Sequence, residues 1–179
     1  MHRTNTERMN RSMEHKVSGK QFITEMCFGC GKDNEGGLQG EFYNLEEGKI
    51  AAFFRPGDTF QGYPQRLHGG ITASILDEAL GRAILPLEPD TWAVTAELSI
   101  RYKKPVPVNT ALKIVAEVTE NKRRLFRSSG ELFLPDGQVA ATATGVYMKQ
   151  PLGQIADVAD MDSGRIRYDQ ENDRETVEY

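Results

Sequence analysis

Two glycines and an acidic residue have the spacing of a reactive centre. His68, Gly69 and Gly70 stand directly before a helical pattern, and Asp77 follows about two turns later. Glycines at a helix start leave backbone N–H groups uncovered, and the positive end of the helix dipole suits a developing oxyanion. Asp77 lies at the edge of the apolar helix face, where partial desolvation suits a general base. A glycine-rich N-cap followed by a solvated acid would give the same pattern.

The helix that carries these residues is expected over residues 69–85. It begins at the glycine pair and stops before Pro86. At ~100° per residue, its apolar residues gather on one broad face. They are Ile71, Ile75, Leu76, Ala79, Leu80, Ala83 and Ile84. A face this wide requires a large partner, and a curved sheet would provide it.

Most of the remaining chain between residues 38 and 148 alternates with the period of two that is typical of strands. Segments 38–44 and 49–54 suit a hairpin, and further strands are expected at 92–102, 112–118, 123–134 and 138–148. The short connections between these strands favour antiparallel pairing. We therefore predict an α+β fold in which an antiparallel sheet of about five to six strands wraps around one long central helix.

Length and composition indicate one folded domain between two polar ends. The chain has 179 residues, of which 39% are hydrophobic and 27% charged, enough for a core without disulfide or metal. We expect a flexible N-terminal segment over residues 1–25, the domain over 26–150 and an acidic tail over 151–179.

Charge and hydropathy exclude several classes of partner. The net charge of −4 does not suggest nucleic-acid binding. No apolar run is long enough for a membrane helix, and the polar N-terminus does not resemble a secretory signal. Its basic character would suit a transit peptide, but Glu7 and Glu14 argue against one because such peptides are poor in acidic residues. We therefore expect a cytoplasmic protein with no nucleic-acid or membrane partner.

Cys27 and Cys30 are the only cysteines of the chain. They supply half of a closed zinc site, which requires four ligands. A redox CxxC motif needs the helix start of a thioredoxin-like context, which the pattern lacks. Without an export signal, reduced thiols are expected. We therefore predict structural thiols, no metal site and no organic cofactor.

Three segments resemble the hotdog-fold acyl-CoA thioesterases of the PaaI-like, phenylacetate-degradation type. They are the Cys27–Gly31 motif with Asn34, Gly37 and Leu38 after it, the stretch from Phe60 through His68 to Asp77, and residues 94–106. With the strand pattern they extend over residues 26–149. The resemblance implies hydrolysis of an acyl-CoA thioester to free acid and CoA, without metal or organic cofactor.

The resemblance also assigns catalytic roles. Asp77 matches the family's catalytic carboxylate, which acts on water, and Thr95 matches a hydroxyl that places this water. Gly70, with Gly69 near it, matches the N–H donor that polarises the thioester carbonyl.

Further residues are expected to bind substrate. Gln61 matches, more loosely, a side chain near the carbonyl, and His68 shapes the helix start or contacts the thioester. The phosphates of CoA require cations near the cleft mouth, for which Lys104 and Arg123 are candidates. Ordinary solvated strand ends would explain both basic residues equally well.

Members of the resembling family form dimers by joining their sheets, with active sites between subunits. We therefore expect a homodimer or a homotetramer, with Asp77 of one chain facing the partner subunit's Gly70.

Two other functions stay open on this fold. A hydratase or dehydratase would rely on a histidine working with an acid, and His68 is the only histidine of the core region. A non-catalytic acyl-CoA sensor would bind without hydrolysis, but the short polar N-terminus has no room for the DNA-binding domain that hotdog regulators carry.

Overall fold

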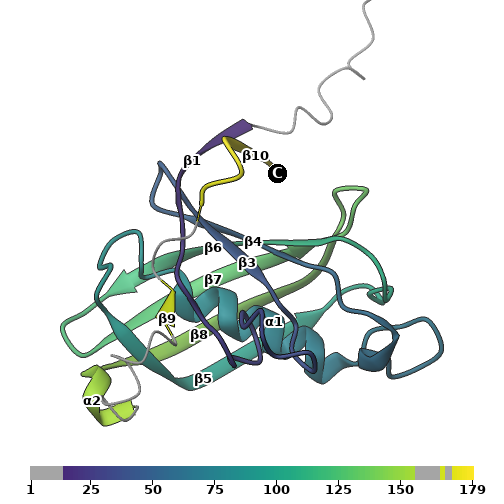
Figure 1. Ribbon diagram of the computed structural model, residues 1–179, viewed down its shortest axis with the longest axis horizontal. Helices are drawn as coiled ribbons and strands as arrows, with labels where there is room; N and C mark the ends of the chain where they lie inside the picture. Colours follow the sequence, from purple (N-terminus) through teal and green to yellow (C-terminus); the bar gives the residue numbers. More distant parts are fainter. Residues whose placement is uncertain (1–13, 156–165, 168–170) are drawn as a thin grey trace, which may run out of the picture.

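The computed structural model describes residues 14–155, 166–167 and 171–179 (Figure 1). One antiparallel sheet of eight strands lies against the long helix α1 (Gly69–Arg82), in the strand order β10-β1-β3-β4-β6-β7-β8-β5. Its strands are β1 (Glu14–Lys20), β3 (Glu41–Leu45), β4 (Ile50–Phe54), β5 (Trp92–Tyr102), β6 (Leu112–Asn121), β7 (Leu125–Phe133), β8 (Val139–Gln150) and β10 (Thr176–Glu178). The predicted α+β hotdog arrangement is confirmed.

Three short elements complete the description. A two-stranded pairing joins β2 (Ile23–Thr24) to β9 (Ile166–Arg167). A 3-10 turn, η1 (Asp58–Phe60), precedes α1, and the short helix α2 (Leu152–Ile155) follows β8. Among the described residues, no helix combines the length and the apolar character needed to cross a bilayer.

The sheet is larger than the predicted five to six strands because the ends of the chain contribute β1 and β10. β1 pairs with β3 on one side and with β10 on the other. Alternate residues of β1 face solvent, so its polar composition resembles that of a tail, while Val17 packs against Leu45, Ala51 and Val177. Part of the segment predicted as flexible is therefore strand. Residues 1–13, and residues 156–165 and 168–170 of the expected acidic tail, lie outside the described residues.

Helix α1 ends at Arg82, three residues before the predicted end. Residues after Ala83 continue as turns, with Leu87 and Glu88 both donating backbone N–H groups to the Ile84 carbonyl. Pro86 lacks an N–H and disfavours helical geometry at the residue before it, which explains the early end.

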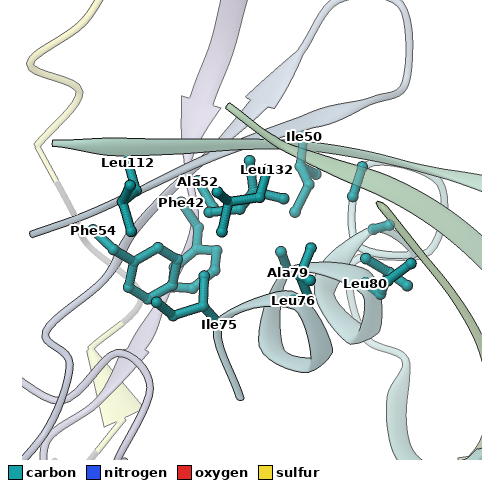
Figure 2. Packing of buried hydrophobic residues seen from close by; sticks show 14 of the residues in the cluster. Phe42, Ile50, Ala52, Phe54, Ile75, Leu76, Ala79, Leu80, Leu112 and Leu132 are labelled. Carbon is teal, nitrogen blue, oxygen red and sulfur yellow. The ribbon is translucent and has the colours of Figure 1, made fainter. Parts of the chain in front are cut away.

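The core lies between α1 and the concave face of the sheet (Figure 2). Ile75, Leu76, Ala79 and Leu80 of α1 are fully buried against residues of β3, β4, β6 and β7. Burying one such Leu or Ile side chain stabilises the fold by about 1.5–3 kcal/mol. The Ser128 hydroxyl donates to the Leu80 carbonyl at 2.9 Å, which ties β7 to the helix. This packing fixes the position of α1, and with it the polar residues on its other face.

Strand β5 forms one edge of the sheet. It pairs with β8, and no other described strand pairs with its outer side. Val94 and Tyr102 are 40% and 53% exposed, which is high for large side chains in a strand. A long strand with an open edge and exposed apolar side chains is a ready site for pairing with another chain.

Candidate active site

Asp77 lies in the middle of α1 and is half-buried, with its carboxylate directed toward β5. The Thr95 hydroxyl donates to both carboxylate oxygens, at 2.9 Å to Oδ1 and 3.2 Å to Oδ2. The structure therefore brings together the two residues that the sequence analysis named as water activator and water positioner. Their roles in catalysis stay predictions.

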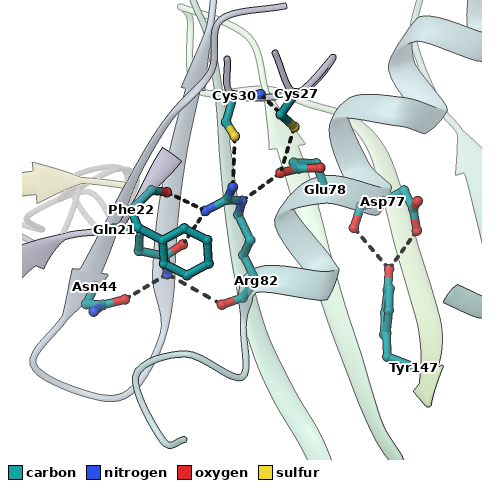
Figure 3. Close-up of polar contacts among 9 residues, drawn as sticks. All are labelled: Gln21, Phe22, Cys27, Cys30, Asn44, Asp77, Glu78, Arg82 and Tyr147. Carbon is teal, nitrogen blue, oxygen red and sulfur yellow. Dashed lines mark hydrogen bonds and ion pairs between the residues drawn. The ribbon is translucent and has the colours of Figure 1, made fainter. Parts of the chain in front are cut away.

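Tyr147 is a third member of this cluster, and the sequence analysis missed it. Its hydroxyl donates to Asp77 Oδ1 at 3.0 Å (Figure 3), and its ring stacks on Phe126. Burial, followed by the negative charge of Asp77, raises the pKa of Tyr147 well above its ordinary value. The phenol therefore stays protonated and remains a donor to the carboxylate. Inward-facing alternation in β8 was the available signal, but alternation alone does not reveal which helix residue the tyrosine meets.

A cavity of about 240 Å³ opens beside this cluster. Asp77, Thr95 and Tyr147 form its polar side. Phe22, Leu85 and Trp92 contribute apolar surface, with the rings of Phe22 and Trp92 5.1 Å apart. The arrangement presents a hydrogen-bonded carboxylate to a space that has room for both a water molecule and an apolar group.

The first turn of α1 differs from the sequence expectation. His68 is the N-cap residue, and its Nδ1 accepts a hydrogen bond from the Gly70 N–H at 3.0 Å. The expected free N–H of Gly70 is therefore occupied, because an N-cap side chain normally pairs with the second or third helical N–H. Among the described residues, the Gly69 N–H has no hydrogen-bond partner. It is the unpaired donor at this helix start.

This cap favours glycine at position 70. A Cβ at Gly70 would lie 3.0 Å from Nδ1 of His68 and 3.2 Å from its Cε1. The His68 ring occupies the space that a side chain would need. His68 thus has a clear structural role in shaping the helix start, one of the two roles that the resemblance implied.

Gln61 and Lys104 also lie around the first turn of α1. The Gln61 Oε1 accepts from the Gln65 N–H at 3.2 Å, which closes the loop that leads to His68. The Tyr102 hydroxyl donates to the Gly69 carbonyl at 2.9 Å, and Lys104 shares an open cavity of about 340 Å³ with Gly69 and Tyr102.

Arg123 lies elsewhere, in the exposed turn between β6 and β7. This turn leads into Leu125, which pairs with Met148, the residue that also pairs with Val94 near the start of β5. Lys104 follows the other end of β5. The structure therefore does not bring Lys104 and Arg123 together within one chain.

The two halves of the expected site are separated along the helix. Gly70 and Asp77 are seven residues apart, which corresponds to a rise of about 10 Å. An oxyanion donor and a general base must both lie within about 3 Å of their respective reacting atoms. Within one chain the two groups are therefore not adjacent.

One set of potential metal ligands occurs in the described part of the chain. The ligand atoms of Cys27, Cys30 and Glu78 lie within 4.8 Å of one another. The Arg82 guanidinium donates to Glu78 Oε1 at 2.7 Å and to Cys30 Sγ at 3.0 Å (Figure 3). A cationic side chain thus occupies the position that a metal ion would take, and the set is one ligand short of a closed zinc site. These residues do not fit a structural metal.

Comparison with known proteins places these features in a family. The family model described as the thioesterase superfamily matches residues 65–141. Acyl-coenzyme A thioesterase THEM4 of Bos taurus is 31% identical, over 60% of this chain and 44% of its own length. A Candida albicans protein named "Uncharacterized protein, mitochondrial" is 36% identical, over 46% of this chain and 37% of its own length. The match thus spans less than half of each relative.

The mitochondrial relative overturns one expectation from the sequence. A cytoplasmic location was predicted because the polar N-terminus does not resemble a secretory signal. The relative named as mitochondrial points to mitochondria instead. Glu7 and Glu14 had argued against a transit peptide, but two acidic residues in a basic, polar stretch do not exclude one.

Solved structures share the fold. A thioesterase superfamily protein has a TM-score of 0.64 and 26% identity, covering 70% of this chain and 61% of its own. The Escherichia coli PaaI protein, at 18% identity, has a TM-score of 0.58 and covers 64% of this chain and 81% of its own, which shows the fold alone. A Bacillus halodurans protein crystallised with CoA is 30% identical, with a TM-score of 0.52, covering 56% of this chain and 66% of its own. The shared fold shows that this chain carries a hotdog domain, and the family model shows that residues 65–141 of it are similar to the thioesterase superfamily.

Proposed function

We propose that this protein hydrolyses an acyl-CoA thioester to a free acid and CoA. The observation that carries the proposal is the Asp77 carboxylate, held by the Thr95 and Tyr147 hydroxyls at the edge of a partly apolar cavity. The thioesterase name of the Bos taurus relative and the CoA bound to the Bacillus halodurans protein support the same chemistry.

The geometry suits Asp77 as the activator of water. Two hydroxyl donors fix the orientation of the carboxylate, which is what a general base requires before substrate arrives. Asp77 then removes a proton from water as the water attacks the thioester carbonyl. Alternatively, Asp77 attacks the carbonyl directly, and water hydrolyses the resulting acyl–Asp77 anhydride to the free acid after CoA has left. Collapse of the tetrahedral intermediate breaks the C–S bond, and the CoA sulfur leaves and takes up a proton.

Backbone N–H groups at the start of α1 are the candidate donors to the carbonyl oxygen. The Gly69 N–H is unpaired within the described chain, and the Gly70 N–H becomes available if the His68 ring turns away. The positive end of the helix dipole adds to this stabilisation. Because the helix start lies about 10 Å from Asp77 along the same helix, the donor has to come from a second chain.

The open edge of β5 suggests how that second chain binds. Thr95 lies near one end of β5, and Tyr102, which contacts Gly69, is its last residue. Antiparallel pairing of two copies of β5 brings the Thr95 end of one chain beside the Tyr102 end of the other. Asp77 would then face the partner subunit's Gly69 and Gly70. We propose a homodimer, which could pair further into a tetramer.

The same pairing gives a role to the two separated cations. Arg123 lies at the Thr95 end of the sheet and Lys104 at the Tyr102 end. In a dimer joined through β5, Arg123 of one chain approaches the partner subunit's Lys104. We propose that this pair of cations binds the phosphates of CoA, for which Arg and Lys are the usual partners.

The hydratase alternative gains no support from the geometry. His68 Nδ1 accepts the Gly70 N–H, so the ring is engaged as a helix cap. Asp77 is bonded to hydroxyl groups rather than to a histidine. His15 pairs with Glu47, but neither residue lines the cavity beside Asp77, so this histidine–acid pair lies outside the proposed site.

Subunit mixing tests the proposal. Asp77→Asn removes the base, and Gly69→Pro removes the unpaired N–H at a helical position where proline is well tolerated. Each homodimer should be nearly inactive in a free-thiol assay with a panel of acyl-CoA substrates. A mixed dimer contains one intact site and one doubly damaged site, so it should recover about half of wild-type activity. Heterodimers without recovered activity would contradict the shared site, and wild-type protein that releases no CoA from any substrate would contradict the proposed hydrolysis.

A further inference from the structure

A cluster of two thiols, a carboxylate and a guanidinium lies beside the cavity, and the proposed hydrolysis uses none of its members. It is formed by Cys27, Cys30, Glu78 and Arg82 (Figure 3). Cys27 and Cys30 come from the loop after β2, and Glu78 and Arg82 from successive turns of α1. Glu78 directly follows Asp77, so the cluster lies next to the proposed site.

The loop is held closely against the helix. The Cys27 N–H donates to the Thr24 carbonyl at 3.0 Å, and the Gly31 N–H donates to the Cys27 carbonyl at 2.8 Å. A Cβ at Gly29 would lie 2.8 Å from the Glu78 carboxyl carbon, so a larger residue there would require the Glu78 side chain to move. The turn places both sulfurs on the side that faces Arg82.

The two sulfurs have different surroundings. Cys30 is fully buried, and its Sγ accepts from Arg82 at 3.0 Å. Cys27 is half-buried and lines the same cavity of about 240 Å³ as Asp77. Cys27 is therefore the sulfur that a small solute in the cavity can reach, with Cys30 directly behind it.

Local hydrogen bonds favour the thiolate of Cys27. Its Sγ accepts the Cys30 N–H at 3.4 Å. Hydrogen bonding from Cys30 lowers the pKa of Cys27 to about 6, although burial and the Glu78 charge act in the opposite direction. The pKa of Cys30 is raised, first by its hydrogen bond to Cys27 and then by burial, so the pair retains one proton. The buried Arg82 guanidinium, whose side chain is 10% exposed, lies beside this negative charge.

We propose that Cys27 and Cys30 form a reactive dithiol that hydrogen peroxide oxidises reversibly to a disulfide. The Cys27 thiolate attacks one peroxide oxygen, the O–O bond breaks, and Cys27 becomes a sulfenic acid as the first water leaves. The Cys30 sulfur then attacks the Cys27 sulfur, releases the second water and forms the S–S bond. Two electrons pass from the two sulfurs to the peroxide. The Cys30 thiol supplies one of the two protons that the waters need, and solvent supplies the other.

The geometry permits this closure with local movement. The two Sγ atoms lie within 4.8 Å of one another, and the two residues are separated by a turn of only two residues. A disulfide requires about 2.05 Å between the sulfurs, which rotation of the side chains and a small shift of the loop would provide. This site is independent of the proposed hydrolysis and requires no acyl-CoA.

Oxidation of the pair can be measured without interference from other thiols, because these are the only two cysteines of the chain. Reduced full-length protein is treated with hydrogen peroxide, and free thiols and peptide masses are measured. We expect both thiols to disappear together, a disulfide between Cys27 and Cys30 within one chain, and recovery with dithiothreitol. Thiols that survive in folded protein, or disulfides that join only separate chains, would overturn the proposal.

Matched variants separate the roles of the two sulfurs. In Cys30→Ser, oxidation should stop at a Cys27 sulfenic acid that dimedone captures. In Cys27→Ser, the buried Cys30 should stay a free thiol, and its oxidation at the wild-type rate would contradict the assignment of Cys27 as the attacking sulfur. A stoichiometric zinc ion that protects both thiols until a chelator removes it would also overturn the proposal.

Alkylation gives a second readout that requires no variant. The charged or titratable groups facing Cys27 are Cys30, Glu78 and Arg82. The rate of Cys27 alkylation by iodoacetamide should rise with a midpoint at about pH 6. At that pH it should exceed the rate of free cysteine by about tenfold, because the larger thiolate fraction outweighs the lower nucleophilicity of a more acidic thiol. A midpoint above pH 8 would remove the basis for Cys27 as the attacking sulfur.

Discussion

In the middle of α1, the Asp77 carboxylate accepts hydrogen bonds from Thr95 and Tyr147 and is half-buried beside a cavity. At the first turn of the same helix, Gly69 and Gly70 are exposed, and the Gly69 N–H has no partner among the described residues. One helix thus carries a carboxylate that already accepts hydrogen bonds and a backbone N–H that is unpaired within the described chain.

The difference follows from what each group has to do. A base that activates water must be ionised and oriented before substrate arrives, so donors from the protein stabilise it. A donor to an oxyanion must remain unpaired until charge develops on the substrate. About 10 Å separates the two along one helix, and the proposed dimer would bring the donor of one chain to the carboxylate of the other.

Removing the hydrogen-bonded Asp77 carboxylate should have the largest effect on turnover. Asp77→Asn keeps the size of the side chain and its Oδ1 acceptor, but it removes the base. We expect kcat to fall by about 10²–10⁴-fold with KM little changed. Steady-state CoA release measures this loss, and an unchanged melting temperature would show that the variant is folded. Turnover within a few-fold of wild type would contradict the role of Asp77.

Removing the unpaired Gly69 N–H should have the next largest effect on turnover. Gly69→Pro deletes one backbone N–H in the first helical turn, and loss of one oxyanion donor typically lowers kcat by about 10²–10³-fold. Gly69→Ala is the matched control, because it retains the N–H and its Cβ would lie 3.9 Å from Tyr102, an ordinary contact. Equal activity of the proline and alanine variants would show that the Gly69 N–H takes no part.

Weakening the support of Asp77 should cost less. Thr95→Val removes the hydroxyl that donates to both carboxylate oxygens. A hydrogen bond to a charged group contributes about 1.5–3 kcal/mol, and at this exposed position the lower end applies, so we expect about a tenfold loss of kcat. Thr95→Ser keeps the hydroxyl and should stay near wild type. If the serine variant loses as much as the valine variant, packing rather than the hydrogen bond is responsible.

Much of this fold was predictable because it depends on local periodicity. The broad apolar face of α1 and the alternation after residue 92 gave the helix, the strands and the wrapped arrangement. β1 and β10 were not predictable in this way. Their strands are polar on alternate residues, and β10 pairs with a strand about 160 residues away in the chain.

The candidate site was predictable only in part, since register is not a property of the sequence pattern. Thr95 and Tyr147 are cross-strand partners, and a bulge between Thr95 and Glu97 shifts the register immediately after this pair. Alternation marks Tyr147 as inward-facing but cannot place it against Asp77. The occupied Gly70 N–H was missed for a similar reason, because the cap depends on the orientation of the His68 ring.

Tyr147 offers a finer test of the hydrogen bonds that Thr95 and Tyr147 donate to Asp77. Tyr147→Phe keeps the buried ring on Phe126 and removes one donor to Asp77, so we expect a loss of kcat of a few-fold, about 1 kcal/mol. Burial and the charge of Asp77 raise the pKa of Tyr147, so the wild-type phenol stays protonated well above its ordinary titration range. The wild-type pH–rate profile should therefore show no decline from this group near pH 10. A decline there that Tyr147→Phe abolishes would contradict the raised pKa.

The smallest expected effect concerns the loop that connects the two elements carrying Asp77 and Thr95. Glu88 lies in the loop between α1, which carries Asp77, and β5, which carries Thr95. Its carboxylate accepts from Lys149 Nζ at 2.7 Å, from Thr91 at 2.7 Å and from Asn121 at 2.8 Å. These hydrogen bonds, that of Lys149 first, lower the pKa of Glu88 from 4.5 to about 2.

A depressed carboxyl pKa stabilises the folded protein above the unfolded pKa, and this contribution is lost as the pH falls from about 4.5 toward 2. The Glu88 side chain is 37% exposed, so solvent screening limits the contribution to roughly 1 kcal/mol or less. Urea unfolding of wild type and Glu88→Gln should therefore differ most near pH 7 and converge near pH 2, with a smaller difference at high salt. Lys149→Gln should reduce the pH dependence in the same way, since it removes the partner that contributes most. A difference between wild type and Glu88→Gln that stays constant from pH 7 to pH 2 would show that the loop is held by packing rather than by the ion pair.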